Sequence, residues 1–343
     1  MLRFHNPGPV TDPKKRQPYI QHMMQGAHIL ATCETTLNEA ERLAADAEAA
    51  CMPGVHARVW HAAYADRRST GISLYIAKND AIPWERVHVH DTGDPTLQLM
   101  VVDATINDKD VCLIVTHASP NSSMTVKTTY LRRILTALQR VEATTGALAV
   151  RRPNVWLGDF NMVTDTALDE LRGTPTGPSA AAMIQAFDDV RQLLGVEDAF
   201  RGRNGSAEAY THGVRRIDRP YASPALFSGT PRLSEARHME YDEVEFIMRT
   251  ARAGLKLHRP DHKGLELRLR FTEDDRGARP WQFVKDAHSP AAWEDTLDAL
   301  HRAADTAASD PEAAMKTWQT EARAVLIKDE KAARRRLYGH ERR

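Results

Sequence analysis

An acid and an amide lie two residues apart at the end of a short apolar run, residues 154–161. Alternate side chains of a strand share one face, so Asp159 and Asn161 are predicted to point the same way at a strand end, where loops often build sites. Held side by side, they could bind a hydrated metal ion, a water molecule and a phosphate oxygen. The same spacing also occurs in turns, where both side chains bind only nearby backbone. The segment alone leaves both interpretations open.

Other polar side chains with related chemistry follow predicted strands elsewhere in the chain. They are Asn6, Glu34, His117 with Asn121, and the pair formed by Asp218 and Asp261-His262. Each also has a structural interpretation. Asn6 would be a turn residue, Glu34 a neighbour of a helix N-cap and His117 a core histidine. Asp218 would be half of a surface ion pair worth under about 1 kcal/mol, and Asp261 would cap a turn before an exposed His262. Taken singly, most favour this structural interpretation.

The elements that would position these groups are mainly short apolar strands. Two groups of strands with helices between them predict an α/β (α+β) fold of two packed sheets, and the short turns favour mostly antiparallel pairing. The first strand is predicted at a sheet edge, residues 108–109 as a hairpin turn and residues 197–200 as a turn. Predicted strands cover residues 2–6, 27–33, 56–62, 71–77, 87–90, 97–106, 111–116, 155–157, 216–222, 243–248 and 265–271. Predicted helices cover residues 17–25, 38–50, 125–144 and 179–194.

The composition changes after residue 271, where a charged, polar stretch is followed by two alanine-rich segments that predict helices. We therefore expect one domain over residues 1–271 and a helical extension over residues 272–343. The basic run at residues 331–336 favours a solvated helix face over a nucleic-acid contact. The two predicted helices of the extension cover residues 291–307 and 311–336.

Composition narrows the class of protein only in part. Lys and Arg together number 46, as do Asp and Glu, so the net charge of zero argues neither for nor against a nucleic-acid partner. Three cysteines without metal-type spacing or a secretory leader fit a reducing, intracellular compartment. No apolar run approaches the length of a membrane span, so no membrane partner is expected. Glycine-rich phosphate loops and the HExxH pattern are absent from the sequence.

In their order along residues 2–271, the polar motifs resemble the endonuclease/exonuclease/phosphatase superfamily. A first strand ends in Asn6 and a second in Glu34, and residues 158–161 read Gly-Asp-Phe-Asn, a motif of the superfamily. The other matching segments are His117-Ala118-Ser119-Pro120-Asn121, Tyr210-Thr211 with Arg216-Ile217-Asp218-Arg219, and Asp261-His262-Lys263. The resemblance implies a four-layer α/β/β/α sandwich of two mostly antiparallel sheets.

Within the superfamily, the chain looks most like the endonuclease domain of non-LTR (LINE-type) retrotransposons. This likeness depends on the residue types at positions 216–219 and 116–122 and on a tail that contains tryptophans. It implies a reverse transcriptase module in a longer relative and a nuclear localisation. Three residues depart from the superfamily pattern: Pro260 before Asp261, Pro7 after Asn6, and His117 where repair-type members have Tyr.

The resemblance also implies which residues do the chemistry. A Mg²⁺ ion, with Mn²⁺ as an alternative, would be held by Asn6, Glu34, Asp159 and Asp261. The catalytic residues would be His117, Asp159, Asn161, Asp218 and His262, and the substrate-binding residues Asn121 and Asn161. Asp218 and His262 would form a dyad in which the carboxylate fixes the imidazole tautomer. The general base stays open between His262 and Asp159.

Three functions are compatible with these motifs. The first is a Mg²⁺-dependent phosphodiester hydrolase that nicks duplex DNA. The second is a phosphatase or phosphodiesterase acting on an inositol phosphate or a lipid headgroup, which the absence of an evident basic pocket motif disfavours. The third is a catalytically decayed module that binds nucleic acid or protein, which the complete set of acids, amide and imidazole disfavours.

Overall fold

The computed structural model describes the part of the chain that contains the predicted domain. The chain divides into two compact units, Met1–Asp274 and Asp275–Arg343, and the described residues all belong to the first. The helical extension predicted over residues 272–343 therefore lies outside the described residues, as does Asn121. The described residues are 1–7, 13–35, 37–52, 55–62, 71–78, 81–120, 122–145, 152–165, 169, 177–205, 210–213, 215–229, 231–250, 254–258 and 260–271.

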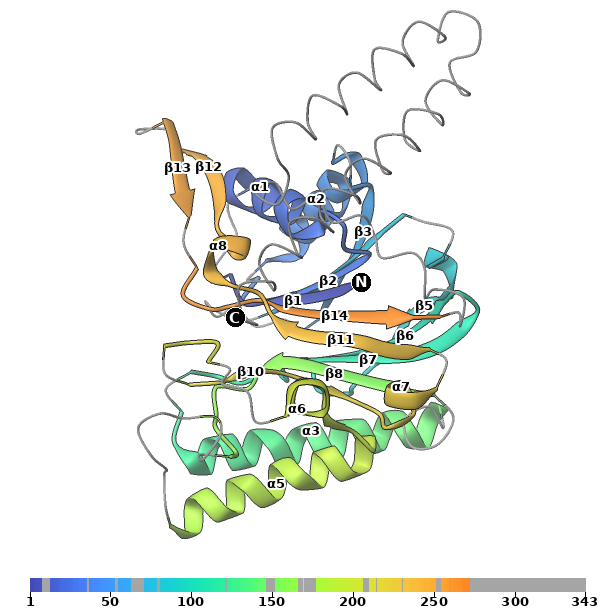
Figure 1. Cartoon of the computed structure of the whole chain (residues 1–343), viewed down its shortest axis with the longest axis vertical. Helices are drawn as coiled ribbons and strands as arrows, with labels where there is room; N and C mark the ends of the chain where they lie inside the picture. Colours follow the sequence, from blue (N-terminus) through green and yellow to red (C-terminus); the bar gives the residue numbers. More distant parts are fainter. Residues whose placement is uncertain are drawn as a thin grey trace, which may run out of the picture. The chain divides into compact units, whose positions relative to one another are not determined.

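Two six-stranded sheets face each other in this unit (Figure 1). Each sheet contains one parallel pair, β1 with β2 and β7 with β8, and the other pairs are antiparallel. The first sheet runs β11 (Arg232–His238), β14 (Leu265–Arg270), β1 (Leu2–His5), β2 (Ile29–Cys33), β4 (Ile72–Ala77) and β3 (Ala57–Ala62). The second runs β5 (Val87–Val89), β6 (Leu99–Ile106), β7 (Lys109–His117), β8 (Asn154–Asp159), β10 (Asp218–Ala222) and β9 (Glu197–Asp198). A separate hairpin joins β12 (Phe246–Thr250) and β13 (Gly254–His258).

Helices cover the outer faces of both sheets (Figure 1). Side chains of α1 (Pro13–Met24) and α2 (Glu39–Cys51) pack on the first sheet, and those of α3 (Met124–Thr145) and α5 (Pro178–Leu194) pack on the second. The predicted four-layer α/β/β/α sandwich of two mostly antiparallel sheets is therefore confirmed. Shorter helices lie in the connections: the 3₁₀ helix η1 (Trp84–Arg86), α6 (Ala199–Asn204), α7 (Ala225–Ser228) and α8 (Tyr241–Val244). No helix of the described residues is long and apolar enough to cross a membrane.

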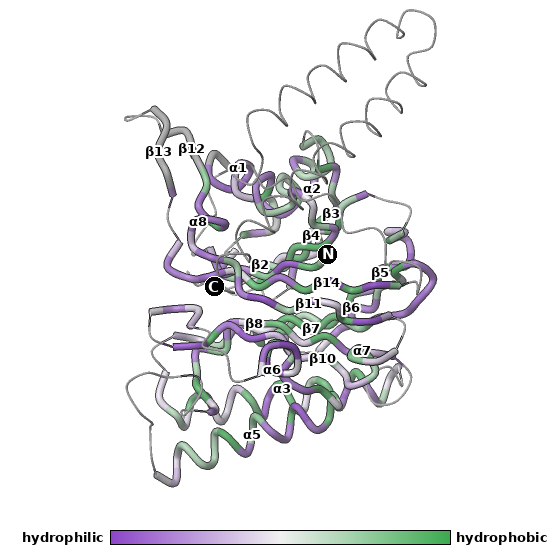
Figure 2. Tube along the Cα trace, in the orientation of Figure 1, coloured by the Kyte–Doolittle hydropathy of each residue, from purple (hydrophilic) through white to green (hydrophobic). Residues whose placement is uncertain are grey.

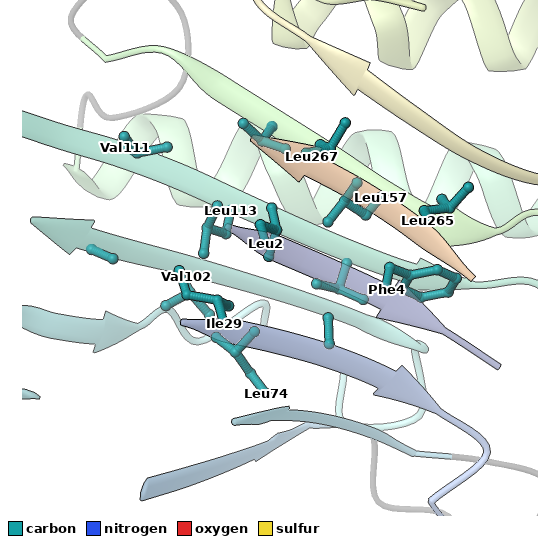
Figure 3. Close-up of a cluster of buried hydrophobic side chains, with 14 of the residues drawn as sticks. Leu2, Phe4, Ile29, Leu74, Val102, Val111, Leu113, Leu157, Leu265 and Leu267 are labelled. Carbon is teal, nitrogen blue, oxygen red and sulfur yellow. The ribbon is translucent and has the colours of Figure 1, made fainter. Parts of the chain in front are cut away.

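Successive side chains of the inner strands point to opposite faces of the sheet, and both faces are buried, so these strands appear in the sequence as continuous apolar runs. On β7, Val111, Leu113 and Val115 pack between the two sheets, whereas Cys112 and Ile114 pack beneath α3 and α5. Figure 3 shows part of the layer between the sheets, and Figure 2 shows the hydrophobic residues gathered on the inner strands. Because both faces are buried, each aliphatic side chain stabilises the fold by about 1.5–3 kcal/mol relative to exposure.

Three local predictions about the strands and turns were wrong. The first strand is not at an edge, because Leu2 pairs with Leu267 on one side and Ile29 on the other. Ile106 pairs with Lys109, so the hairpin turn consists of Asn107 and Asp108, both with left-handed φ angles of 47° and 57°. Residues 197–200 form the short strand β9 and the start of α6 rather than a turn.

The C-terminal strands were predicted only in part. The strands β11 and β13 were missed, and residues 241–244 form α8, so that β12 begins at Phe246. On β11, the polar side chains of Glu235 and Arg237 interrupt the apolar pattern. Arg237 makes ion pairs with Glu243 and with the fully buried Glu266 of β14, at 2.8 and 3.2 Å. Tertiary ion pairs thus stabilise a strand whose own sequence has weak strand character.

Candidate active site

Polar side chains continue the inter-sheet face at one end of the inner strands. Val155 and Leu157 of β8 pack between the sheets, so Asp159, which ends the strand, continues that face. Asp159 is paired in register with His117 at the end of β7 and with Asp218 at the start of β10. Three neighbouring strands therefore place His117, Asp159 and Asp218 side by side, and all three are fully buried.

Glu34 reaches this cluster through an unusual backbone conformation. Cys33 of β2 faces the inter-sheet layer, so simple alternation would direct the next side chain toward the helices. Glu34 instead has a φ of 57°, in the left-handed region that non-glycine residues seldom adopt outside turns and functional sites. Its Oε1 atom accepts a hydrogen bond from Nδ2 of Asn6 at 3.2 Å. The local strain thus brings the carboxylate toward the site.

Asn6 connects the two sheets at this point. Its Nδ2 group donates to Oε1 of Glu34 at 3.2 Å and to Oδ2 of Asp159 at 3.0 Å. Glu34 and Asn6 come from the first sheet and Asp159 comes from the second, so one amide holds carboxylates from both. The interpretation of Asn6 as only a turn residue is therefore incomplete.

His117 is held with one ring nitrogen toward the carboxylates. Its Nδ1 atom is 2.7 Å from Oε1 of Gln98, an acceptor, which fixes the proton on Nδ1. Nε2 then lies 3.5 Å from Oε1 of Glu34 and 4.0 Å from Oδ2 of Asp159. Tyr130 donates to the backbone oxygen of His117 at 3.0 Å. Gln98 was not predicted as a site residue, because nothing in its strand segment distinguishes it.

Asp218 and His262 form a buried hydrogen-bonded pair. Nδ1 of His262 is 2.9 Å from Oδ2 of Asp218 and 3.9 Å from Oδ2 of Asp159. The side chain of His262 is only 10% exposed and that of Asp218 is fully buried, so neither the exposed histidine nor the surface ion pair considered above is present. His5 supports the loop, since its Nε2 atom is 3.1 Å from the backbone oxygen of His262.

The buried charges shift one another's pKa values. Burial alone would lower the pKa of His262, but the charge and hydrogen bond of Asp218, together with the charge of Asp159, raise it to about 10. Burial and the neighbouring Asp218 raise the pKa of Asp159 to about 6. The pKa of Asp218 is lowered despite burial, chiefly by His262. The pKa of Glu34 is also lowered against burial, by His117 and Asn6.

Asn161 does not continue the strand beyond Asp159. Its φ of 47° is left-handed, its backbone N–H donates to Oδ1 of Asp159 at 2.9 Å, and its Nδ2 group donates to the backbone oxygen of Ala118 at 2.7 Å. The alternation of side chains along the strand therefore stops at Asp159. The Oδ1 atom of Asp159 binds nearby backbone, as the turn interpretation of the pair expects. The other carboxylate oxygen of Asp159 remains directed at Asn6, so one side chain both closes the turn and enters the site.

Glycine is required directly before Asp159 by the approach of two strands. A Cβ atom on Gly158 would lie 2.4 Å from the backbone oxygen of Thr116 on β7. This contact is far shorter than van der Waals separation, so β7 and β8 could not keep their spacing with a larger residue. The glycine thus sets the distance between His117 and Asp159.

Asp261 lies at the exposed margin of the site. Its side chain is 76% exposed, and its Oδ2 atom is 3.7 Å from Nε2 of His212. The backbone oxygen of Asp261 accepts from the hydroxyl of Tyr241 at 3.4 Å. His212 was not predicted as a site residue, although it directly follows the Tyr210-Thr211 pair that the motif analysis singled out.

The donor set at the centre of the cluster suits a hard cation. Asn6 brings the carboxylates of Glu34 and Asp159 to one point, with hydrogen bonds of 3.2 and 3.0 Å. Carboxylate oxygens are ligands that Mg²⁺ and Mn²⁺ prefer, and Mg²⁺ is usually held by one or two carboxylates. The lowered pKa of Glu34 keeps its carboxylate ionised at neutral pH, as a metal ligand requires.

Comparison with solved structures identifies the fold. The chain is similar to an AP endonuclease from Leishmania major, with a TM-score of 0.56 and 16% identity over 79% of this chain and 87% of that one. An AP endonuclease from Archaeoglobus fulgidus matches with a TM-score of 0.51 and 15% identity over 78% and 98%. The endonuclease domain of TRAS1, a telomere-specific non-LTR retrotransposon, has a TM-score of 0.49 and 14% identity over 79% and 99%. No family model and no curated protein matches the sequence.

The protein therefore has the fold of the endonuclease/exonuclease/phosphatase superfamily, as the order of the motifs implied. Its polar cluster lies at the strand ends of the two facing sheets.

Proposed function

We propose that the protein is a Mg²⁺-dependent phosphodiesterase that nicks duplex DNA. One observation carries the proposal: the hydrogen bonds of Asn6 join Glu34 to Asp159, and Asp159 lies 3.9 Å from His262 of the Asp218 pair. Residues up to 228 positions apart in the sequence thus form one buried group of carboxylates and imidazoles. Two solved structures that share the fold are named AP endonucleases, which supports DNA as the substrate.

To hydrolyse a phosphodiester, this group of carboxylates and imidazoles would have to perform two tasks. Charge that develops on the phosphate must be offset, and a water molecule must be aimed in line with the leaving oxygen. A Mg²⁺ ion held by Glu34 and Asp159, with Asn6 beside them, would supply positive charge for the first task. The buried Nε2 atom of His117 faces the same carboxylates and would bind a non-bridging phosphate oxygen when protonated.

The charge states of His262 and Asp159 assign their roles. With a pKa of about 10, His262 is an imidazolium at neutral pH, so it would donate a hydrogen bond to the phosphate while Asp218 holds its orientation. Asp159 lies 3.9 Å from His262 in the same buried group, where its carboxylate could accept the proton of the attacking water. Because His262 already carries its proton, we infer that Asp159, and not His262, is the general base. Asn161 would keep Asp159 in place through the turn.

The remaining residues that the motifs implied have supporting places in this proposal. Asp261, exposed beside His262, would contribute an outer metal contact. Asn121, outside the described residues, would contact the substrate. The retrotransposon type rests on the residue types at positions 216–219 and 116–122. A reverse transcriptase in a longer relative would follow from that type.

A plasmid-nicking assay tests the proposal. Supercoiled plasmid with Mg²⁺ should convert to nicked circles, and Glu34→Ala and His262→Ala should each slow the conversion at least about a hundredfold, as expected for loss of a charge-stabilising group. Glu85→Ala and His88→Ala, at exposed positions of η1 and β5, are matched controls that should nick like the wild type.

Assays with other substrates distinguish the alternative functions. Cleavage of an abasic oligonucleotide but not of undamaged DNA would indicate a repair-type enzyme and overturn the retrotransposon type. Phosphate release from inositol phosphates without nicking would overturn the nuclease and favour the phosphatase. Binding of DNA without turnover in Mg²⁺ and Mn²⁺ would indicate a decayed module.

A further inference from the structure

A second group of metal-binding side chains lies beside the proposed magnesium centre. One ligand atom each from His212, Asp261 and His262 lies within 4.8 Å of the other two. His212 has no place in the proposed hydrolysis, and Asp261 has only an outer one. The two imidazoles face each other with ring centroids 4.7 Å apart and an interplanar angle of 35°.

Backbone contacts hold the two loops that carry these side chains together. The backbone N–H of Lys263 donates to the oxygen of Thr211 at 2.8 Å, which joins the residue after His262 to the residue before His212. The hydroxyl of Thr211 accepts from the backbone N–H of Asp218 at 3.0 Å, so the first loop is also tied to β10. The three candidate ligands are therefore placed by the fold rather than by chance surface proximity.

The distance between His212 and Asp261 is close to that expected for tetrahedral coordination by nitrogen and oxygen. Metal–ligand bonds of about 2.0–2.1 Å place the ligand atoms of a tetrahedral Zn²⁺ roughly 3.3 Å apart. Nε2 of His212 and Oδ2 of Asp261 are already 3.7 Å apart. Because the side chains of His212 and Asp261 are 43% and 76% exposed, a metal ion could enter and keep a water molecule as its fourth ligand.

The orientation of His262 also favours a metal at this position. Its Nδ1 atom is engaged by Asp218 at 2.9 Å, which leaves Nε2 as the ring nitrogen that can coordinate a metal, with release of the Nε2 proton to solvent when the metal binds. A carboxylate on the far ring nitrogen is the common support of a histidine that binds zinc. Two imidazoles and one carboxylate prefer a transition metal, whereas the carboxylate-amide set around Asn6 prefers Mg²⁺.

We propose that His212, Asp261 and His262 form a transition-metal site that shares His262 with the hydrolytic centre and binds Zn²⁺ in preference to Mg²⁺. Occupation of this site removes His262 from the hydrolytic centre, so Zn²⁺ inhibits an enzyme that Mg²⁺ supports. The binding part of this inference stands on the three side chains alone, and the inhibition part rests on the proposed nuclease function.

Zinc affinity can be measured without any substrate. Titration of the purified protein against a chromophoric zinc chelator should show one tight site, and His212→Gln should weaken it at least about tenfold, since one of three protein ligands is lost. His88→Gln, an exposed histidine on β5, is the matched control and should bind like the wild type. Co²⁺ as a spectroscopic probe should give visible absorption bands in the wild type that His212→Gln weakens.

Equal zinc affinity of the wild type and His212→Gln, with both variants folded by circular dichroism, would overturn the site. For the inhibition part, nicking at fixed Mg²⁺ is measured while Zn²⁺ is raised, and His212→Gln should need at least about tenfold more Zn²⁺ for half inhibition. Equal inhibition of both would overturn that part. Absence of nicking under all conditions would instead defeat the proposed function and leave the zinc titration interpretable.

Discussion

The segment Arg216–Arg219 contributes to two buried charge clusters with opposite character. Asp218 faces the candidate active site, where carboxylates crowd together and the pKa of Asp159 rises to about 6. Arg216 instead makes two hydrogen bonds of 2.7 Å with Asp198, whose pKa is lowered, chiefly by this arginine acting against burial. Arg219 lies over the rings of Phe160 and Phe187, with its guanidinium carbon 5.0 and 4.9 Å from the ring centroids.

The difference separates a structural use of buried charge from a functional one. In the arginine cluster each charge has an opposite partner or an aromatic face, as expected where ionic groups hold a fold together. In the site, the carboxylate of Asp159 lies beside that of Asp218, and this one buried contact between acids costs stability in return for reactivity. We therefore expect substitutions in the two clusters to have opposite consequences.

The largest effect is expected in the arginine cluster. Arg216→Met should lower the free energy of unfolding by about 3–5 kcal/mol, because it leaves Asp198 without its principal partner and removes a 3.2 Å contact with the buried Asp169. Urea unfolding followed by circular dichroism measures the change. A loss under about 1 kcal/mol would show that this cluster does not stabilise the fold.

The site should respond in the opposite way. Asp159→Asn should reduce nicking by roughly 10²–10³-fold, since it removes a metal ligand and the proposed base. The free energy of unfolding should stay the same or rise, because a buried carboxylate next to Asp218 is neutralised. If the variant were instead destabilised and fully active, Asp159 would belong with the structural charges.

A substitution that forces β7 and β8 apart is expected to have a smaller effect. Gly158→Ala should lower the free energy of unfolding by about 1–3 kcal/mol, because the new methyl group would meet the backbone oxygen of Thr116 at 2.4 Å. Nicking by the folded variant should also fall, since His117 and Asp159 are directly paired on these strands. Ala222→Gly on β10 is a control that removes a methyl group from the same sheet. Wild-type stability of Gly158→Ala would contradict the tight approach.

The smallest expected effect is a shift in the pKa of His262. Asp218 raises the pKa of His262 to about 10, so Asp218→Asn should move it to lower pH, as NMR titration of the imidazole in the metal-free protein would show. Because the folded pKa exceeds the ordinary value of 6.5, the protonated histidine stabilises the wild type fully below about pH 6.5 and less as the pH rises through 10. Asp218→Asn should lose most of this alkaline dependence, and an unchanged titration would contradict the pairing.

Much of the architecture could be predicted from the sequence because it follows from burial. The strands at residues 27–33, 111–116 and 155–157 are buried on both faces, and such strands appear as continuous apolar runs. The site residues could be assembled because their motifs keep an order along the chain. The register that brings His117, Asp159 and Asp218 together then follows from strand pairing.

Other features depend on contacts that no local pattern reveals. The left-handed backbone at Glu34, together with the hydrogen bond from Asn6, directs the carboxylate into the site. Asn161 leaves the strand because its amide binds the backbone of Ala118, 43 residues away. His212 becomes a neighbour of His262 through tertiary contacts such as the backbone hydrogen bond between Thr211 and Lys263. Strands such as β11 depend on ion pairs with distant partners.

The central claim is that Glu34 and His262 act in one hydrolytic centre, and a double variant tests it most directly. Residues that act as one unit are strongly non-additive, so the nicking rate of Glu34→Gln/His262→Gln with Mg²⁺ should equal that of the slower single variant within a few-fold. If the two losses multiplied, or if the double variant nicked like the wild type, the two side chains would not share a centre.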